Sequence, residues 1–217
     1  MQLFVLARGA VGFLSGLCNP GETDYPPGVN IDRIRDTLHR HPPNLVQLNT
    51  PTRHASVALV IRPNRDLLMI RRAEREGDPW SGHMAFPGGR REPVDPDHQA
   101  TATRETFEEV GLQLPRSAAI GRLDDTVSPS QATAPRLVIS AFVFAVDDPD
   151  PTLTPNGEVA STHWFHLDRF LHGEGRTTMQ YQWNDRNVTL PAVYLDDQHI
   201  WGLSLRILDD FVGKLRR

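Results

Sequence analysis

The segment from Asp95 to Gly111 carries both a start and a stop signal for a helix, and it constrains what the rest of the chain can fold into. Asp95 is a residue type that caps helix N-termini, and Pro96 suits the first helical position. Gly111 is a usual helix stop. One stripe of this helix consists of Ala100, Thr103, Phe107 and Val110. Because such a stripe has to be covered by another element, the segment predicts a helix packed on a sheet.

The opposite stripe of the same helix is acidic. At about 100° per residue, Glu109 lies about 40° from Glu105 in one direction, and Glu108 lies about 60° in the other. Like charges at these spacings disfavour a helix by roughly 0.2–0.5 kcal/mol each, and anions in the last turn oppose the helix dipole. Arg104 offsets only part of this repulsion. A bound divalent cation would offset the rest, and a solvated acidic face is the alternative.

Apolar runs on both sides of this helix predict strands, which makes the chain an α/β protein of the α+β type. Two runs joined by a Pro-Asn turn predict a strand pair at Val57–Ile61 and Leu67–Ile70. Later runs predict further strands at 137–146, 159–165 and 188–195, and Ile200 to Val212 predicts a closing amphipathic helix that buries Trp201.

The first 50 residues differ in character from the remainder of the chain and are predicted to be an N-terminal extension. Residues 19–30 are rich in proline and glycine, as a linker would be. Ile31, Ile34 and Leu38 follow helical spacing before Pro42, which predicts one short helix. Residues 51–217 are predicted to form the main domain.

Composition excludes several classes of function. Of the 23 basic residues only Lys214 is a lysine, which argues against Schiff-base chemistry and a phosphate-loop lysine. A net charge of -4 gives no overall basic field for nucleic acid. The apolar stretch before Cys18 is interrupted by Arg8 and is too short to span a membrane. With one cysteine, no intramolecular disulfide and no cysteine-held zinc site can form, so a cytoplasmic location is expected.

A glycine pair, Gly88 and Gly89, lies shortly before the acidic helix. Glycine lets the backbone approach a phosphate closely and offer N–H donors. Acids on a neighbouring helix can hold magnesium, which takes oxygen ligands and often shares them with substrate phosphates. Together the loop and the helix predict a clamp for a diphosphate.

The stretch from Gly88 to Leu112 resembles the Nudix box, whose pattern is G-x5-E-x7-R-E-U-x-E-E-x-G-U with U apolar. Thr106 stands at a usually aliphatic position, and Asp95 stands where the first glutamate would fall, after a one-residue expansion of the loop. That expansion is typical of the branch resembling coenzyme A pyrophosphatases. Phe86–Gly89 matches the F-P-G-G of this branch, Leu67–Arg71 is similar to its L-L-T-x-R strand, and Ile200–Leu208 is similar to its closing I-W-G-x-T-x-R-I-L helix. The basic lead-in usual for that branch is absent.

The resemblance implies a Nudix α/β/α sandwich with a mixed sheet, the box helix and a C-terminal helix. It implies a hydrolase that cleaves the diphosphate of a nucleoside diphosphate linked to another moiety, with coenzyme A or its thioesters as the first expectation. Glu105, Glu108 and Glu109 are expected to hold Mg²⁺ or Mn²⁺, and Glu105 or Glu109 to act as the base. Arg104 is expected to orient these carboxylates by ion pairing.

Other residues are candidates for substrate contact, each with a structural alternative. Expected substrate contacts are Gly88, Gly89, Arg71, His83 and Trp80, and further acids that could reach the site are Glu92, Asp95 and Glu158. Asp95 is expected mainly to cap the helix. Two rival functions stay open, a pyrophosphatase for ADP-ribose or a nucleotide sugar, and a Nudix-fold module that binds a nucleotide without cleaving it. A small-molecule nucleotide is the expected partner, and a homodimer is left open.

Overall fold

The structure of the chain is a computed structural model, and it describes residues 30–47, 52–78, 80–128, 136–183 and 186–217. The helices are α1 (Ile31–Arg40), α2 (His98–Val110), α3 (Leu167–Leu171) and α4 (Gly202–Leu215), with a 3-10 turn at Arg116–Ala118. The strands of the larger sheet are β1 (Thr52–Ile61), β2 (Asp66–Arg72), β3 (Met84–Ala85), β4 (Gly88–Arg90), β5 (Ala119–Arg122), β6 (Thr126–Val127), β7 (Arg136–Ala145) and β8 (Val159–His166). A smaller sheet contains β9 (Arg176–Trp183), β10 (Arg186–Leu195) and β11 (Gln198–Trp201).

The larger sheet is mixed, as predicted. Its main path runs β3-β2-β1-β7-β5, with β4 on β1, β6 on β7 and β8 on β2. The central pair is parallel and extends from Thr52 opposite Arg136 to Ile61 opposite Ala145, whereas β1 and β2 form the predicted antiparallel pair. The strand that carries the glycine pair, β4, is antiparallel to the first half of β1, with Gly88 opposite Val57 and Gly89 opposite Ser56.

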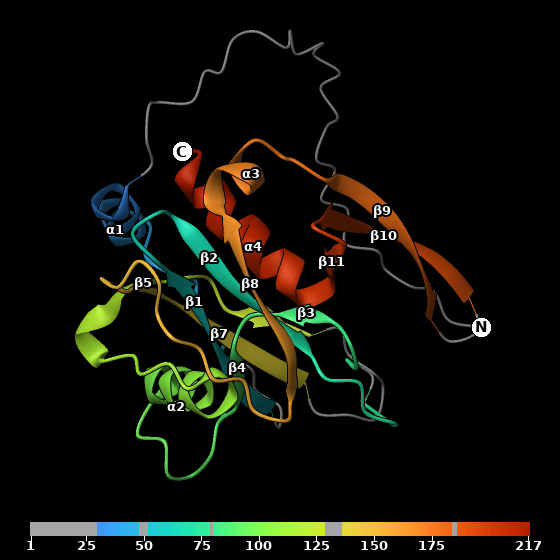
Figure 1. The fold of residues 1–217 in the computed structure, drawn as a ribbon, viewed down its shortest axis with the longest axis horizontal. Coiled ribbons are helices and arrows are strands. Elements are labelled where there is room, and N and C mark those ends of the chain that lie inside the picture. The colour runs from blue at the N-terminus through green and yellow to red at the C-terminus, as the bar shows by residue number, and fades with distance from the viewer. Residues whose placement is uncertain (1–29, 48–51, 79, 129–135, 184–185) are drawn as a thin grey trace, which may run out of the picture.

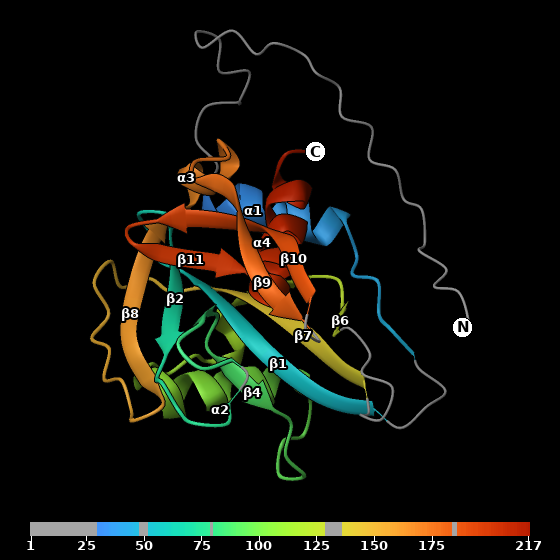
Figure 2. The same ribbon diagram turned by 90° about the vertical axis from the view of Figure 1, so that its right-hand side faces the viewer.

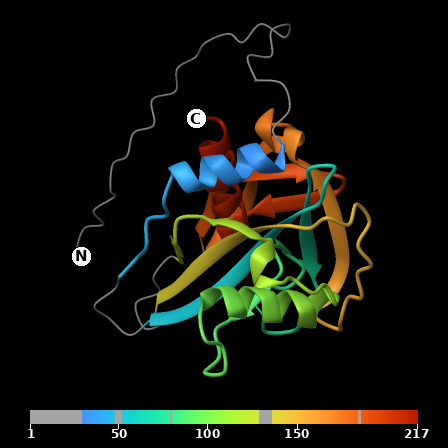
Figure 3. The same cartoon turned by 90° about the vertical axis from the view of Figure 1, so that its left-hand side faces the viewer.

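Side chains alternate between two cores, one on each face of this sheet. On β1, Leu59 and Ile61 face the core that includes α1 and α4, while Ala58 and Val60 face the core under α2. Figure 3 shows α1, in blue, and α2, in green, on opposite sides of the sheet. The result is the expected α/β/α sandwich, because alternate residues in the central part of β1 are buried under one layer or the other.

The predicted short helix near the N-terminus is confirmed as α1. Asn30 is its N-cap, and the Asn30 side chain accepts a hydrogen bond from the Arg33 N–H. It packs on β5, where a Cβ at Gly121 would lie 2.6 Å from the Leu38 side chain. Residues 1–29 of the predicted extension lie outside the described residues, and the division into an extension over 1–50 and a main domain stays a prediction. Among the described residues, no helix is long and apolar enough to cross a membrane.

The C-terminal helix begins later than predicted. Ile200 and Trp201 belong to β11, where Trp201 pairs with Ala192, and α4 starts only at Gly202. Gly202 has a φ of 64°, which breaks the run from strand to helix. The smaller sheet that this strand completes extends away from the body of the molecule along β9 and β10 (Figure 1). Figure 2 shows β11 and α4 close together beside the larger sheet.

The predicted buried face of the central helix is wrong except at Val110, which is buried. The side chains of α2 that are buried are Thr101, Ala102, Thr106, Glu109 and Val110. Phe107 is 50% exposed instead. Small side chains at 102 and 106 let α2 lie close to the sheet, and the Thr106 hydroxyl donates to the Ala102 carbonyl at 2.7 Å, so its polar atom is satisfied inside the helix. This rotation turns Glu109 towards the sheet, where burial changes its chemistry.

Candidate active site

The acidic side chains of α2 lie in three different environments. Only 3% of Glu109 is exposed. The Glu105 side chain is mostly buried and that of Glu108 is about half exposed. The three predicted metal ligands therefore run from the sheet side of the helix outwards to solvent.

Arg104 connects the outer part of this group. Its guanidinium contacts the Asp95 carboxylate at 2.9 and 3.0 Å, Glu105 at 3.0 Å and Glu108 at 2.9 Å. It also donates to the Arg90 carbonyl at 3.0 Å, which ties β4 to the helix. The Asp95 carboxylate raises the pKa of Arg104, and Arg104 holds the pKa of Asp95 well below its usual range. This geometry gives Arg104 the means to orient the two glutamates.

The predicted helix cap is wrong by two residues. Asp97, and not Asp95, is the N-cap, since its side chain accepts from the Ala100 N–H at 2.8 Å. Asp95 lies in the preceding turn, where its carboxylate accepts from the Glu92 N–H and from the Thr101 hydroxyl. Asp95 is buried because it is the acceptor for a guanidinium, and capping was the wrong explanation for it.

Glu109 differs from Glu105 and Glu108 because its carboxylate is bound by a backbone N–H and not by the Arg104 guanidinium. Its Oε2 accepts from the Gly88 N–H at 2.8 Å. Burial is the largest influence and raises the pKa of Glu109 to about 7, and the charges of Glu105 and Glu158 act in the same direction. The Gly88 bond and Arg72 oppose this change without cancelling it. Burial also raises the pKa of Glu105.

Both glycines of the predicted phosphate loop lie against other parts of the protein, Gly88 against backbone and Gly89 against a side chain. A Cβ at Gly88 would lie 2.3 Å from the Ser56 carbonyl oxygen, and one at Gly89 would lie 2.4 Å from the Glu105 carboxyl carbon. The Gly88 N–H, predicted to donate to a phosphate, donates to Glu109 instead. The glycine pair thus lets the carboxylates of α2 reach the backbone of β4, and this reason could not be read from the sequence.

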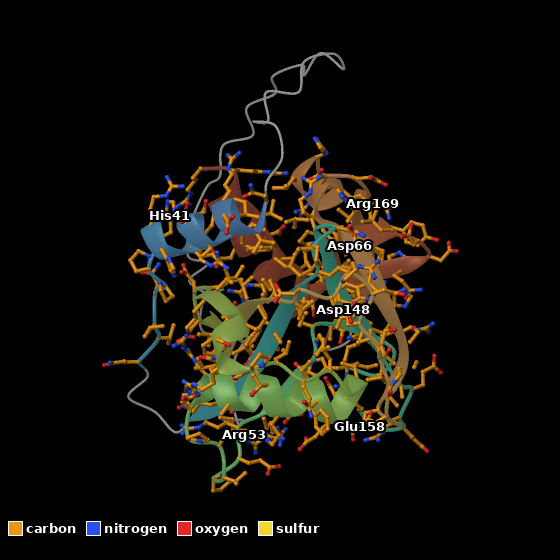
Figure 4. The ribbon with its side chains drawn as sticks, turned by 60° about the vertical axis from the view of Figure 1, so that its left-hand side comes forward. His41, Arg53, Asp66, Asp148, Glu158 and Arg169 are labelled. Carbon is orange, nitrogen blue, oxygen red and sulfur yellow. The ribbon has the colours of Figure 1, made fainter. Side chains whose placement is uncertain are left out.

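The two other candidate acids are placed differently. Glu158 precedes β8 beside the end of α2, as Figure 4 shows, and it forms an ion pair with Arg75 at 3.1 Å. The same loop is fixed to the helix, because the Asn156 N–H donates to the Glu109 carbonyl at 2.9 Å. The influence of Glu158 on Glu109 shows that this loop faces the acidic group. Glu92 is exposed and only its backbone bonds to the Asp95 turn.

The carboxylates of α2 are chemically suited to bind a divalent cation, although in this structure they do not converge on a single point. Within the described residues, no three acidic, histidine or cysteine side chains form a ready metal cage. Glu105 and Glu108 are held by Arg104. Carboxylate oxygens are the ligands that Mg²⁺ and Mn²⁺ take. Such an ion would bind Glu109 and Glu105 and neutralise their negative charge. These residues therefore fit the cation that the sequence predicts.

The other predicted substrate residues separate into two groups. Arg71 and His83 both line a cavity of about 330 Å³ between the two sheets. Burial lowers the pKa of His83, which favours the neutral ring. Trp80 is 45% exposed and does not belong to the lining. The structure thus brings two of these three side chains together.

The remaining wall of this cavity was not predicted. Trp201, predicted to be core, is half-buried and lines the cavity together with Tyr181 and Gln198. Its ring centroid lies 4.6 Å from that of His83 and 4.8 Å from that of Tyr181. No local signal in the sequence could have shown this, because the residues meet only when β11 reaches β3.

The sequence of the chain is similar to a known domain and to known proteins. A sequence model of the NUDIX domain matches residues 51–185, more than half of the chain. The probable nudix hydrolase C6G9.05 of Schizosaccharomyces pombe is 30% identical over 187 residues, which is 82% of this chain and 62% of that protein. Mitochondrial coenzyme A diphosphatase NUDT8 of Homo sapiens is 30% identical over 146 residues, covering 66% of this chain and 60% of that protein.

Similarity to a solved structure supports the same fold. The crystal structure of a MutT/nudix family protein from Enterococcus faecalis aligns with a TM-score of 0.55 at 18% identity, over 86% of this chain and 70% of that one. The chain spans about three fifths of the length of the Schizosaccharomyces pombe and Homo sapiens relatives. The predicted family is confirmed by the domain match together with the fold: the chain belongs to the Nudix family.

Proposed function

We propose that the chain is a divalent-metal-dependent pyrophosphohydrolase that cleaves the diphosphate of a nucleoside diphosphate linked to another moiety. The observation that carries this proposal is Glu109, a carboxylate that is 3% exposed, whose pKa burial raises to about 7, beside Glu105 on the same helix. A fold gains nothing from burying such a charge unless a cation or a proton-transfer step uses it.

Glu105, Glu108 and Glu109 would hold the cation, which when bound would neutralise charge on the diphosphate and lower the pKa of a bound water. Glu109 or Glu105 would take the proton from the attacking water. The raised pKa of Glu109 favours it for that role at neutral pH, since a general base works best near the operating pH. Arg104, held by Asp95, would keep Glu105 and Glu108 in place. Glu158 and Glu92 would at most supplement this set.

Coenzyme A or a thioester of it is the proposed substrate. Support comes from the F-P-G-G element at Phe86–Gly89, the expanded loop before Arg104 and the relative whose name is a coenzyme A diphosphatase. Gly89, Arg71, His83 and Trp80 are proposed substrate contacts. Cleavage should give 3′,5′-ADP and 4′-phosphopantetheine. The rival substrates are ADP-ribose and nucleotide sugars, which have the same diphosphate.

The test is a panel of diphosphate compounds incubated with the purified protein and Mg²⁺ or Mn²⁺. We expect coenzyme A to be among the best substrates and each compound to be split at its diphosphate. If ADP-ribose or a nucleotide sugar is turned over roughly a hundredfold more efficiently, a difference of about 2.7 kcal/mol, the substrate proposal fails and the hydrolase proposal stands. If nothing is cleaved with either metal, the chain is a nucleotide-binding module, although that class would be expected to lose box glutamates.

The proposed compartment is the cytoplasm, and the proposed partners are small nucleotides without nucleic acid or membrane. Support comes from the single Cys18 and the net charge of -4, which suit a reducing compartment and offer no basic field. Fractionation of cells that produce the protein tests the location, and light scattering tests whether it forms a homodimer.

A further inference from the structure

The cavity between the two sheets has the chemistry of a site for a planar ring. Its walls include the side chains of His83, Tyr181 and Trp201, and the ring centroids of His83 and Tyr181 lie 4.6 and 4.8 Å from that of Trp201. All three are half-buried, so each keeps surface that a ligand can cover. A volume of about 330 Å³ is at the small end of ligand sites and suits one fragment of a substrate.

The polar groups of the cavity complement the rings. Gln198 contributes an amide with both a donor and an acceptor, and Met84 supplies an apolar wall. Such an amide can pair with the edge of a purine, while aromatic side chains stack on its face. The phosphopantetheine half of coenzyme A has no ring for these walls.

The cavity is within reach of the acidic helix. Met84 lines it, and Gly88, whose N–H binds Glu109, follows four residues later, a span of at most about 14 Å in an extended chain. Arg71 also lines the cavity, with 42% of its side chain exposed. A phosphate attached to a ring in the cavity could therefore lie against Arg71, a short distance along the chain from the strand that binds Glu109.

We propose that this cavity binds the nucleobase of the substrate, with the ring stacked on Tyr181 and Trp201 and the adjoining phosphate on Arg71. The smaller sheet, β9 to β11, is then the element that selects a nucleotide over other diphosphates. This inference rests on the proposed function for its biological meaning, but it concerns binding and not cleavage.

The test measures binding of AMP and of ribose 5-phosphate, which lacks a base, to the full chain in EDTA by isothermal titration calorimetry. Stacking contributes enough per base that Tyr181→Ala and Trp201→Leu should each raise the Kd for AMP roughly 5- to 150-fold. Neither substitution should change binding of ribose 5-phosphate. Arg71→Gln should weaken both ligands by the same factor, because it removes the phosphate contact alone.

Phe107→Ala is the control, since Phe107 is an exposed aromatic side chain on α2 and is outside the cavity lining. It should leave the Kd for AMP unchanged. Trp201 packs beside His83, so its substitution can disturb β11. Tyr181→Ala, on the protruding β9, is therefore the deciding variant, and thermal unfolding of every variant accompanies the titrations.

Three results would overturn the proposal. The first is an AMP affinity in wild type no higher than that of ribose 5-phosphate, and the second is an unchanged AMP affinity in Tyr181→Ala. The third is a loss of 4′-phosphopantetheine binding in the cavity variants while AMP binding is kept, which would assign the cavity to the other half of the substrate. This binding test involves neither metal nor hydrolysis. If AMP binds as expected but the protein cleaves no diphosphate, the proposed function is wrong and this inference remains valid.

Discussion

Replacing Glu109 by glutamine should make the metal-free protein more stable at high pH. The carboxylate is 3% exposed, and its pKa in the folded protein is about 7, against 4.5 for the ordinary side chain. An acid with a raised pKa in the folded state favours folding while it is protonated, and this contribution is lost as the pH rises through about 7. At about 1.4 kcal/mol for each pH unit between the two pKa values, the ionised Glu109 costs about 3 kcal/mol above pH 8.

Glutamine has no such pH dependence and keeps an oxygen that can accept from the Gly88 N–H. Urea unfolding in EDTA should therefore show the free energy of unfolding of Glu109→Gln, relative to the parent, rising by about 2–3 kcal/mol between pH 5 and pH 8. Groups that titrate alike in both proteins cancel in this difference. Added Mg²⁺ should remove most of the loss in the parent protein, because the cation replaces the proton as the partner of the carboxylate.

A Glu109 on a solvated helix face would give a different result. Relief of one like-charge contact and one dipole contact would stabilise the variant by a few tenths to about 1 kcal/mol, with little dependence on pH in this range. A flat difference between pH 5 and pH 8 would show that the charge is already solvated or paired, and the reasoning that links its burial to a cation would be refuted.

The same contacts lead to three further predictions. Mg²⁺ or Mn²⁺ at a hundredfold excess over its Kd should raise stability by about 2.7 kcal/mol in thermal unfolding, whereas sodium chloride at matched ionic strength should not. Asp95→Asn should lower the free energy of unfolding at pH 7 by roughly 2–4 kcal/mol in urea unfolding, because it breaks the pair with Arg104. The parent should lose the stability that the low pKa of Asp95 provides as the pH falls below about 4, and the variant should not show this loss. Gly89→Ala should keep the fold but displace the Glu105 carboxylate and lower kcat roughly 10- to 100-fold, whereas Gly88→Ala, which meets backbone, should unfold at lower urea.

Strand positions could be predicted because burial on both faces leaves continuous apolar runs such as those of β1 and β2. The ends of α2 were predicted to within a few residues from Asp95, Pro96 and Gly111. Its orientation was not, since hydrophobicity assigns Phe107 to the core. Close packing instead favours the small Ala102 and Thr106. The central helix is thus a case in which size, and not polarity, decides which face is buried.

The candidate site was predictable where it depends on neighbours in sequence. The three glutamates and Arg104 are spaced along one helix, so their proximity follows from helical geometry. The partner of Arg104 at Asp95 and the cavity residues Tyr181 and Trp201 depend on a turn and on strands far apart in the chain. In β9 the apolar Met179, Tyr181 and Trp183 alternate with Gln180 and Gln182, which is a strand signal that the sequence analysis missed.

The central claim is that the buried glutamate serves diphosphate cleavage, and the kcat of Glu109→Gln with coenzyme A and saturating Mg²⁺ tests it most directly. We expect a fall of roughly 10²–10⁴, the usual range for a positioned acid–base group, in a protein that remains folded. The control is Glu76→Gln, an exposed glutamate outside the helix, which should turn over like the parent. A folded Glu109→Gln protein with the turnover of the parent would contradict the claim and show that this carboxylate has no part in the reaction.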